Sequence, residues 1–130
     1  MSRDLTKLSP FMHGKAIEFI SACHDAGIAD VFIICTDRSD ADQLLAFNCH
    51  ASNCKPGQSA HNAQNADGLP SSEAFDIGII RAGKYIGDGN DLDYQKAGLI
   101  GKSIGLVWAG DWTSFKEVAH FQNPNWRKPS

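Results

Sequence analysis

The sequence predicts an α+β fold in a single domain spanning residues 1–130. Helical and strand-like segments follow one another without a regular β-α-β alternation, which argues against a doubly wound parallel sheet. The chain has 130 residues, of which 42% are hydrophobic. That is enough for one compact core and too short for a second domain.

Three segments have the spacing of helices. Ser9 followed by Pro10 is typical of a helix start, because serine caps the first turn and proline fits its first position. Apolar residues then recur at helical intervals up to Gly27, a favourable residue for a helix end. The first expected helix runs from Pro10 to Gly27 and the third from about Asp91 to Ser103. The second runs through Leu44, Leu45 and Phe47, and Ser39, Asp40 or Asp42 can begin it.

The strand candidates are short and rich in β-branched or aromatic residues. They cover Val31–Thr36, Ala74–Ile80, Tyr85–Ile86, Leu106–Trp108 and Ala119–Phe121, the second and third being joined by a turn at residues 82–84. Between the first two strands, residues 48–72 form a long polar stretch that we expect to be a loop. Loops of that length in a compact domain usually serve function or mobility. Residues 123–130 are expected to be a loosely held end.

Charge and hydropathy exclude several classes of function. The formal net charge is -3, the pI is about 5.9, and basic residues are scattered, so we expect no nucleic-acid partner. No apolar run approaches the roughly 20 residues of a membrane span, so no membrane insertion is expected. The N-terminus lacks the apolar region of a secretory signal. Nothing indicates an obligate oligomer, and a monomer is expected.

Four cysteines are present, none in the paired spacing of a structural zinc site. Cys23 and Cys35 fall in helical and strand-like segments, where a cysteine usually serves as a small buried apolar residue. Cys49 and Cys54 leave three alternatives open: thiols on a loop, a loop disulfide, or adventitious metal binding.

The Glu117-x-x-His120 spacing is the most informative feature of the chain. It places a carboxylate and an imidazole within reach of one point, where the histidine could hold a metal and the glutamate could activate its water. His61 and Asp76, which ends the step Ala74-Phe75-Asp76, add two ligand candidates. Two histidines and one carboxylate leave zinc an open position, as catalytic zinc sites require.

These motifs occur in an order that resembles the LAS-type zinc peptidases of peptidoglycan, and especially the L-alanyl-D-glutamate endopeptidases of phage endolysins. The matching segments are Thr36-Asp37-Arg38-Ser39, Ser59-x-His61, Ala74-Phe75-Asp76, Gly110-Asp111-Trp112 and Glu117-x-x-His120-Phe121-Gln122. The resemblance runs from the helix start at Leu8 to Gln122. Each match alone is weak, and the ordered set is specific.

The resemblance implies a small antiparallel sheet that carries one zinc ion and is flanked by helices. His61, Asp76 and His120 match its zinc ligands, and Glu117 matches the catalytic acid and base. Arg38 matches the arginine that holds the scissile carbonyl oxygen. Ser59 is a candidate to bind substrate, or to fix the loop that enters His61.

Two departures from the family pattern affect this assignment. Fourteen residues separate His61 from Asp76, more than the family spacing, so an insertion is expected there as a loop beside the metal that could shape substrate access. Asp67 lies within it and is a rival ligand, although Asp76 follows the Ala-Phe step that the motif asks for. Asp37 replaces a residue that is more often aromatic, and its charge could draw the Arg38 guanidinium away from substrate.

Two classes of function follow. The first is a zinc endopeptidase that cleaves the L-alanyl–D-glutamate amide of the wall peptide stem, as a phage endolysin released from the host bacterial cytoplasm onto the wall. A D,D-dipeptidase or carboxypeptidase acting on D-alanyl termini is the nearest relative within that class. The second is a binding module that keeps zinc for structure and recognises wall peptides without cutting them.

Overall fold

The computed structural model describes residues 2–28, 30–49, 51–52 and 54–127 and has the predicted α+β fold. Its helices are α1 (Pro10–Asp25), α2 (Asp40–Asn48) and α3 (Leu92–Ser103), with single 3-10 turns η1 (Leu5–Lys7), η2 (Ala60–Asn62) and η3 (Ala109–Asp111). Its strands are β1 (Val31–Cys35), β2 (Ala74–Arg81), β3 (Lys84–Tyr85), β4 (Val107–Trp108) and β5 (His120–Gln122). No helix in the described part of the chain has the length and apolarity needed to cross a membrane.

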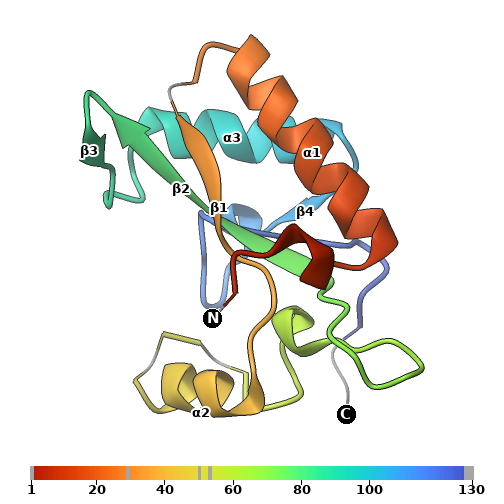
Figure 1. The fold of residues 1–130 in the computed structure, drawn as a ribbon. Helices are drawn as coiled ribbons and strands as arrows, with labels where there is room; N and C mark the ends of the chain where they lie inside the picture. The colour runs from red at the N-terminus through yellow and green to blue at the C-terminus, as the bar shows by residue number, and fades with distance from the viewer. Residues whose placement is uncertain (1, 29, 50, 53, 128–130) are drawn as a thin grey trace.

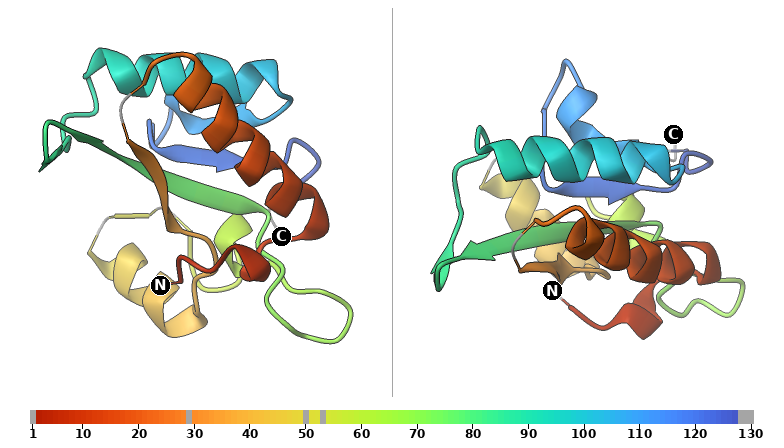
Figure 2. Two further views of the ribbon diagram at one scale, coloured as in Figure 1. Left: turned by 45° about the horizontal axis from the view of Figure 1, so that its top comes forward. Right: turned by 90° about the horizontal axis from the view of Figure 1, so that it is seen from above.

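The strands form one antiparallel sheet in the order β1-β2-β5-β4, with β3 paired to the far end of β2 as a hairpin arm. Helices α1 and α3 lie along one face of this sheet (Figures 1 and 2). Helix α2 and the 3-10 turn η2 lie on the other side, below the sheet in the view of Figure 1. The small antiparallel sheet flanked by helices is therefore confirmed.

Side chains along β2 alternate between a face packed in the core and a face that carries Asp76. Phe75, Ile77 and Ile79 are fully buried in the core against α1 and α3. Because side chains in a strand alternate between faces, Asp76 points to the opposite side, toward η2. In β5 the buried Phe121 joins the same core, and its ring centroid lies 4.8 Å from that of Phe19 in α1. His120 and Gln122 therefore lie on the face of Asp76.

The helix ends follow the capping signals of the sequence. The Ser9 hydroxyl accepts a hydrogen bond from the Met12 amide at the start of α1, and Pro10 is the first helical residue. Gly27 follows the helix with a φ of 77°, a conformation that suits glycine. Ser39 caps α2 in the same way through the Asp42 amide, and the Asp91 carboxylate caps α3 by accepting from the Asp93 amide.

Two segments expected to be loose carry local structure. The polar stretch 48–72 contains η2 and a short excursion closed by a bridge between Gln64 and Pro70. In the tail, Asn123 is buried, and its side-chain amide donates to Glu73 Oε2 at 2.7 Å. Residues 128–130 of the predicted loose end lie outside the described residues. The four cysteines are present as thiols, and no disulfide joins Cys49 to Cys54.

Candidate metal centre

The register of the sheet aligns two of the predicted ligands. Asp76 in β2 pairs directly with His120 in β5. Directly opposed residues in antiparallel strands have Cβ atoms about 5 Å apart on the same face. Ligand candidates 44 positions apart in the chain are thereby brought side by side by backbone pairing alone.

The third ligand candidate comes from outside the sheet. His61 lies in η2, which the Ser59 hydroxyl caps by accepting a hydrogen bond from the His61 amide at 3.2 Å. The Arg38 amide donates to the His61 carbonyl at 3.1 Å, so η2 is tied to the segment that follows β1. The His61 side chain is 2% exposed and points at Asp76.

The two imidazoles converge on one carboxylate oxygen. Asp76 Oδ1 lies 3.2 Å from His61 Nε2 and 2.9 Å from His120 Nδ1. The nitrogen on the other side of each ring is already engaged. His61 Nδ1 lies 2.7 Å from the carbonyl oxygen of Thr36, and His120 Nε2 lies 2.8 Å from Gln122 Oε1.

These outer contacts fix the tautomer of each ring. A carbonyl oxygen only accepts, so His61 Nδ1 and His120 Nε2 carry the protons. In the neutral rings, the lone pairs of His61 Nε2 and His120 Nδ1 then both face Asp76 Oδ1. Three acceptors around one point require a cation or added protons between them. The donor set therefore fits a divalent metal ion, and outer partners of this kind are typical of metal-binding histidines.

The same proximity perturbs the ionisation of the site. Burial opposes charge on His61, but the Asp76 carboxylate outweighs it and raises the pKa of His61 to about 10. Burial likewise opposes charge on Asp76. The two histidines prevail there and hold the pKa of Asp76 well below its ordinary value. The pocket thus strongly favours positive charge next to the carboxylate.

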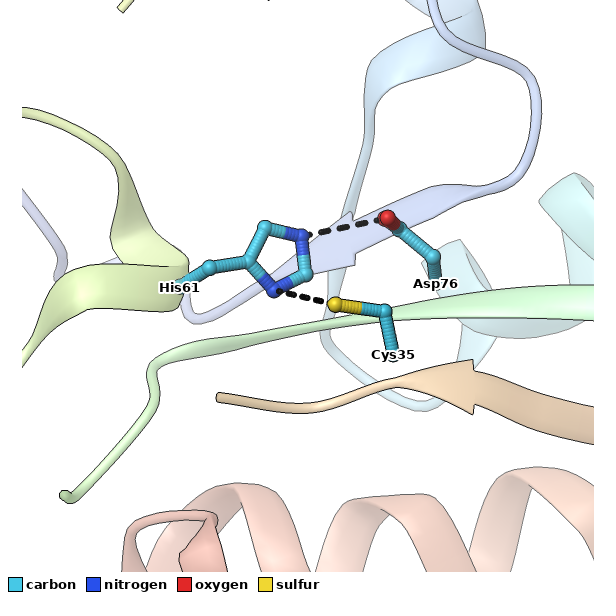
Figure 3. Close-up of side chains that lie close together, drawn as sticks. All are labelled: Cys35, His61 and Asp76. Carbon is cyan, nitrogen blue, oxygen red and sulfur yellow. Dashed lines mark hydrogen bonds and ion pairs between the residues drawn. The ribbon is translucent and has the colours of Figure 1, made fainter. Parts of the chain in front are cut away.

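Cys35 also belongs to this cluster. Cys35, His61 and Asp76 offer ligand atoms that all lie within 4.8 Å of one another, so they could together hold a metal ion (Figure 3). A register shift between Ile33 and Cys35 places Cys35 opposite Asp76. Such a bulge re-aims a side chain that strict alternation would direct toward the core.

The Cys35 thiol approaches His61 from the opposite side to Asp76. Its sulfur lies 3.8 Å from Nδ1, the nitrogen bonded to Thr36, whereas Asp76 lies at Nε2 (Figure 3). The His61 lone pair that faces Asp76 and His120 therefore points away from this thiol. A metal bound between the two histidines and the aspartate would have three protein ligands.

Arg38 and Glu117 reach the same place from two loops. Arg38 Nη2 lies 3.6 Å from Asp76 Oδ2. Among the described residues its guanidinium makes no ion pair with Asp37, so the neighbouring acid does not draw it away. Glu117 precedes β5, and burial raises the pKa of its carboxyl.

A pocket of about 240 Å³ opens over the cluster. Its walls include Arg38, Ser59, His61, Glu117 and His120, together with two tryptophans, Trp112 and Trp126. The Trp112 ring centroid lies 5.5 Å from that of His120. The described residues offer the Glu117 carboxyl no hydrogen-bond donor, so it stays open to water in the pocket.

The structure thus brings together Arg38, Ser59, His61, Asp76, Glu117 and His120. It places Asp67 elsewhere, exposed in the turn at residues 65–68. The extra residues between His61 and Asp76 were expected beside the metal, yet none of 62–75 lines the pocket. They instead close on themselves, the Asn65 amide donating to the Leu69 carbonyl.

Sequence reasoning missed three contributors: Cys35, Gln43 and the role of Gln122. Gln122 stood in the matched motif, and its place two residues after His120 in a strand was the signal that both share a face. Cys35 is aimed by a bulge, which leaves no mark in the local pattern. Gln43 acts through Arg38 and is treated below.

The fold is similar to that of a solved structure, the L-Ala D-Glu endopeptidase ChiX of Serratia marcescens. The TM-score is 0.65 and the identity 18%, with 92% of this chain and 82% of that chain covered. At this identity the likeness shows a common fold. No protein-family model matches the chain, and no curated protein matches it significantly.

Proposed function

We propose that the protein is a zinc-dependent peptidoglycan endopeptidase that cleaves the L-alanyl–D-glutamate amide of the wall peptide stem. The observation that carries this proposal is the convergence of His61, Asp76 and His120 on one point, with Glu117 and Arg38 in the same pocket wall. The fold shared with an L-Ala D-Glu endopeptidase supports the choice of bond. A phage endolysin acting on the wall after release from the host cytoplasm is the setting that we propose for it.

The proposed chemistry divides among the residues of the pocket. His61, Asp76 and His120 would hold the ion, which when bound acidifies water and polarises a carbonyl. Glu117 takes the proton of the attacking water and returns it to the leaving amine, since a carboxyl can act as base and then as acid. Arg38 keeps its charge at any working pH and offers donors to the oxygen that becomes negative.

The geometry favours an enzyme over a structural metal site. A structural zinc site is closed by four protein ligands, whereas a catalytic one keeps a position open. Here the fourth candidate, Cys35, lies behind the His61 ring, and the open side of the cluster faces the pocket. An acid beside that open side, such as Glu117, has no purpose in a purely structural site.

Mass spectrometry of purified peptidoglycan digested by the zinc-loaded protein tests the proposal. We expect new L-alanine C-termini paired with free D-glutamate amines. Glu117→Ala should abolish them while the protein keeps its metal, and Glu18→Ala, an exposed acid on α1, should digest like the wild type. His120→Ala should lose both metal and turnover.

Each other result has a defined meaning. Release of D-alanine or D-alanyl-D-alanine would move the enzyme to the D,D-dipeptidases and carboxypeptidases. No product from fully metallated protein, on walls of several chemotypes, would support the binding module instead. Turnover by Glu117→Ala would refute the assigned mechanism.

A further inference from the structure

Helix α2 is held against the protein by a polar side chain. Gln43 is its one buried residue and is 0% exposed. Its neighbours Leu44 and Leu45 are 48% and 63% exposed. A surface helix normally packs through a buried apolar stripe. In α2 the apolar residues Ala46 and Phe47 are only half-buried, so the contacts of Gln43 are an important part of its attachment.

Gln43 uses both ends of its amide. Its Oε1 accepts a hydrogen bond from Arg38 Nη1 at 2.9 Å. Its Nε2 donates to the Ser52 hydroxyl at 2.9 Å and to the Cys54 carbonyl at 2.7 Å. These three short hydrogen bonds use both donors of the buried amide and one of the two acceptor sites of its oxygen. They join the helix to Ser52, to Cys54 and to the Arg38 guanidinium.

The guanidinium is held in a position that costs stability. Arg38 Nε is buried and meets no hydrogen-bond partner among the described residues, and leaving a buried donor unpaired is unfavourable. Without these contacts, an arginine side chain would place its guanidinium in solvent. Gln43 on one side and Asp76 on the other keep it instead at the pocket wall.

The backbone of Arg38 is also held in place by hydrogen bonds, as its guanidinium is. Its carbonyl accepts from Asn62 Nδ2 at 2.8 Å, and its amide donates to the His61 carbonyl. With both ends anchored, the remaining freedom lies in the side-chain torsions, and Gln43 removes it. The partners of Gln43 at Ser52 and Cys54 also line the pocket.

We propose that Gln43 is a positioning residue of the active site, through which α2, Ser52 and Cys54 set the Arg38 guanidinium toward the scissile carbonyl. The proposal rests on the proposed function, in which Arg38 binds the oxygen of the amide being cut. It gives α2, a helix with no part in the core, a role in the chemistry.

Three variants separate this role from a structural one. Gln43→Met keeps the size of the side chain and removes all three hydrogen bonds. Gln43→Glu keeps an acceptor for Arg38 and removes the donors to Ser52 and Cys54. Leu45→Ala alters an exposed residue of the same helix and is the matched control.

The first readout does not depend on activity. Arg38 is one of four arginines, with Arg3, Arg81 and Arg127, so its Nε–H signal in ¹⁵N NMR spectra is identified by its loss in Arg38→Lys. Because Arg38 Nε is buried, this proton should exchange slowly in the wild type and in Leu45→Ala. Gln43→Met should lose the signal to fast exchange, and Gln43→Glu should keep it. A persistent signal in Gln43→Met would overturn the proposal.

The second readout is turnover on peptidoglycan. Gln43→Met should lower kcat about 10- to 100-fold, as is typical when a group that orients a site residue is lost. KM should change less, and Gln43→Glu should recover most of the rate. In the Arg38→Lys background, Gln43→Met should cost no further rate, because both changes remove one interaction. Independent, additive losses would overturn the proposal.

The two readouts distinguish failure of the proposed function from failure of the proposed role of Gln43. If the wild type cuts no wall peptide, the proposed function fails while the NMR experiment still decides whether Gln43 holds Arg38. If Gln43→Met does not fold, Gln43→Glu decides alone. Loss of the Arg38 signal in folded Gln43→Glu would then count against Gln43 as its anchor.

Discussion

At the scale of single residues, we expect Gln122 to determine which nitrogen of His120 is available to a metal. Its Oε1 lies 2.8 Å from His120 Nε2 and keeps the proton on that nitrogen, which leaves Nδ1 for the ion. Gln122→Met preserves the volume and removes the acceptor. We expect zinc affinity to fall about 10- to 100-fold. Competition with a chromophoric chelator measures it.

Gln64→Met, an exposed position in the excursion between His61 and Asp76, is the matched control for Gln122 and should bind zinc like the wild type. Equal affinity of Gln122→Met and wild type would mean that His120 is oriented by the sheet alone. In that case the side-chain contact would be incidental.

Cys35 provides a second prediction at this scale. Because its sulfur faces His61 Nδ1 rather than Nε2, it should stay outside the coordination sphere. Cobalt(II)-substituted protein should therefore show no thiolate charge-transfer band, and Cys35→Ser should leave the spectrum unchanged. Cys49→Ser, at an exposed thiol, is the control.

A strong near-ultraviolet band that disappears in Cys35→Ser would put sulfur on the metal. The site would then have four protein ligands, the arrangement of a structural zinc. The same spectrum therefore also weighs the enzyme against the binding module.

At the scale of elements, α3 packs so closely on the sheet that glycine is required. A Cβ at Gly101 would lie 2.5 Å from the ring of Phe121, the residue that follows His120 in β5. Gly101→Ala should destabilise the fold by roughly 1–3 kcal/mol through overpacking, more than the gain in helix propensity returns. Denaturant unfolding measures it.

Gly14 in α1 is the matched control, since no atom of the described residues lies within 4 Å of the Cβ it would acquire. Gly14→Ala should stabilise the protein by roughly 0.5–1 kcal/mol, the propensity difference between the two residues in a helix. If Gly101→Ala also stabilised the protein, the close approach of α3 to β5 would be wrong.

The elements also show where sequence reasoning succeeds. Helix starts at Ser9 and Asp91 could be predicted because a cap acts within its own turn, and Ser39 was one of three starts left open for α2. The ligand candidates could be found because the family resemblance fixes their order. The role of Gln43 could not be predicted, because a glutamine in a polar helix is expected to face solvent. Its partners at Arg38 and Cys54 are set by tertiary packing.

At the scale of the whole molecule, the candidate metal site consists of parts of the chain that only the folded state brings together. His61 comes from η2, Asp76 from β2 and His120 from β5, and the unfolded chain holds none of them together. An ion that binds the folded state alone stabilises it by mass action. The effect is about 4 kcal/mol when free ion exceeds Kd a thousandfold.

Zinc should accordingly raise the melting temperature by roughly 15 °C for a domain of this size, and chelation should reverse the rise. His120→Ala should abolish the shift. His24→Ala, on a histidine whose side chain is 88% exposed, should retain it in full. Differential scanning calorimetry over a series of zinc concentrations makes the measurement. A shift that survives His120→Ala would mean that zinc stabilises the fold from another place, since this ion would then not need the ligand on β5.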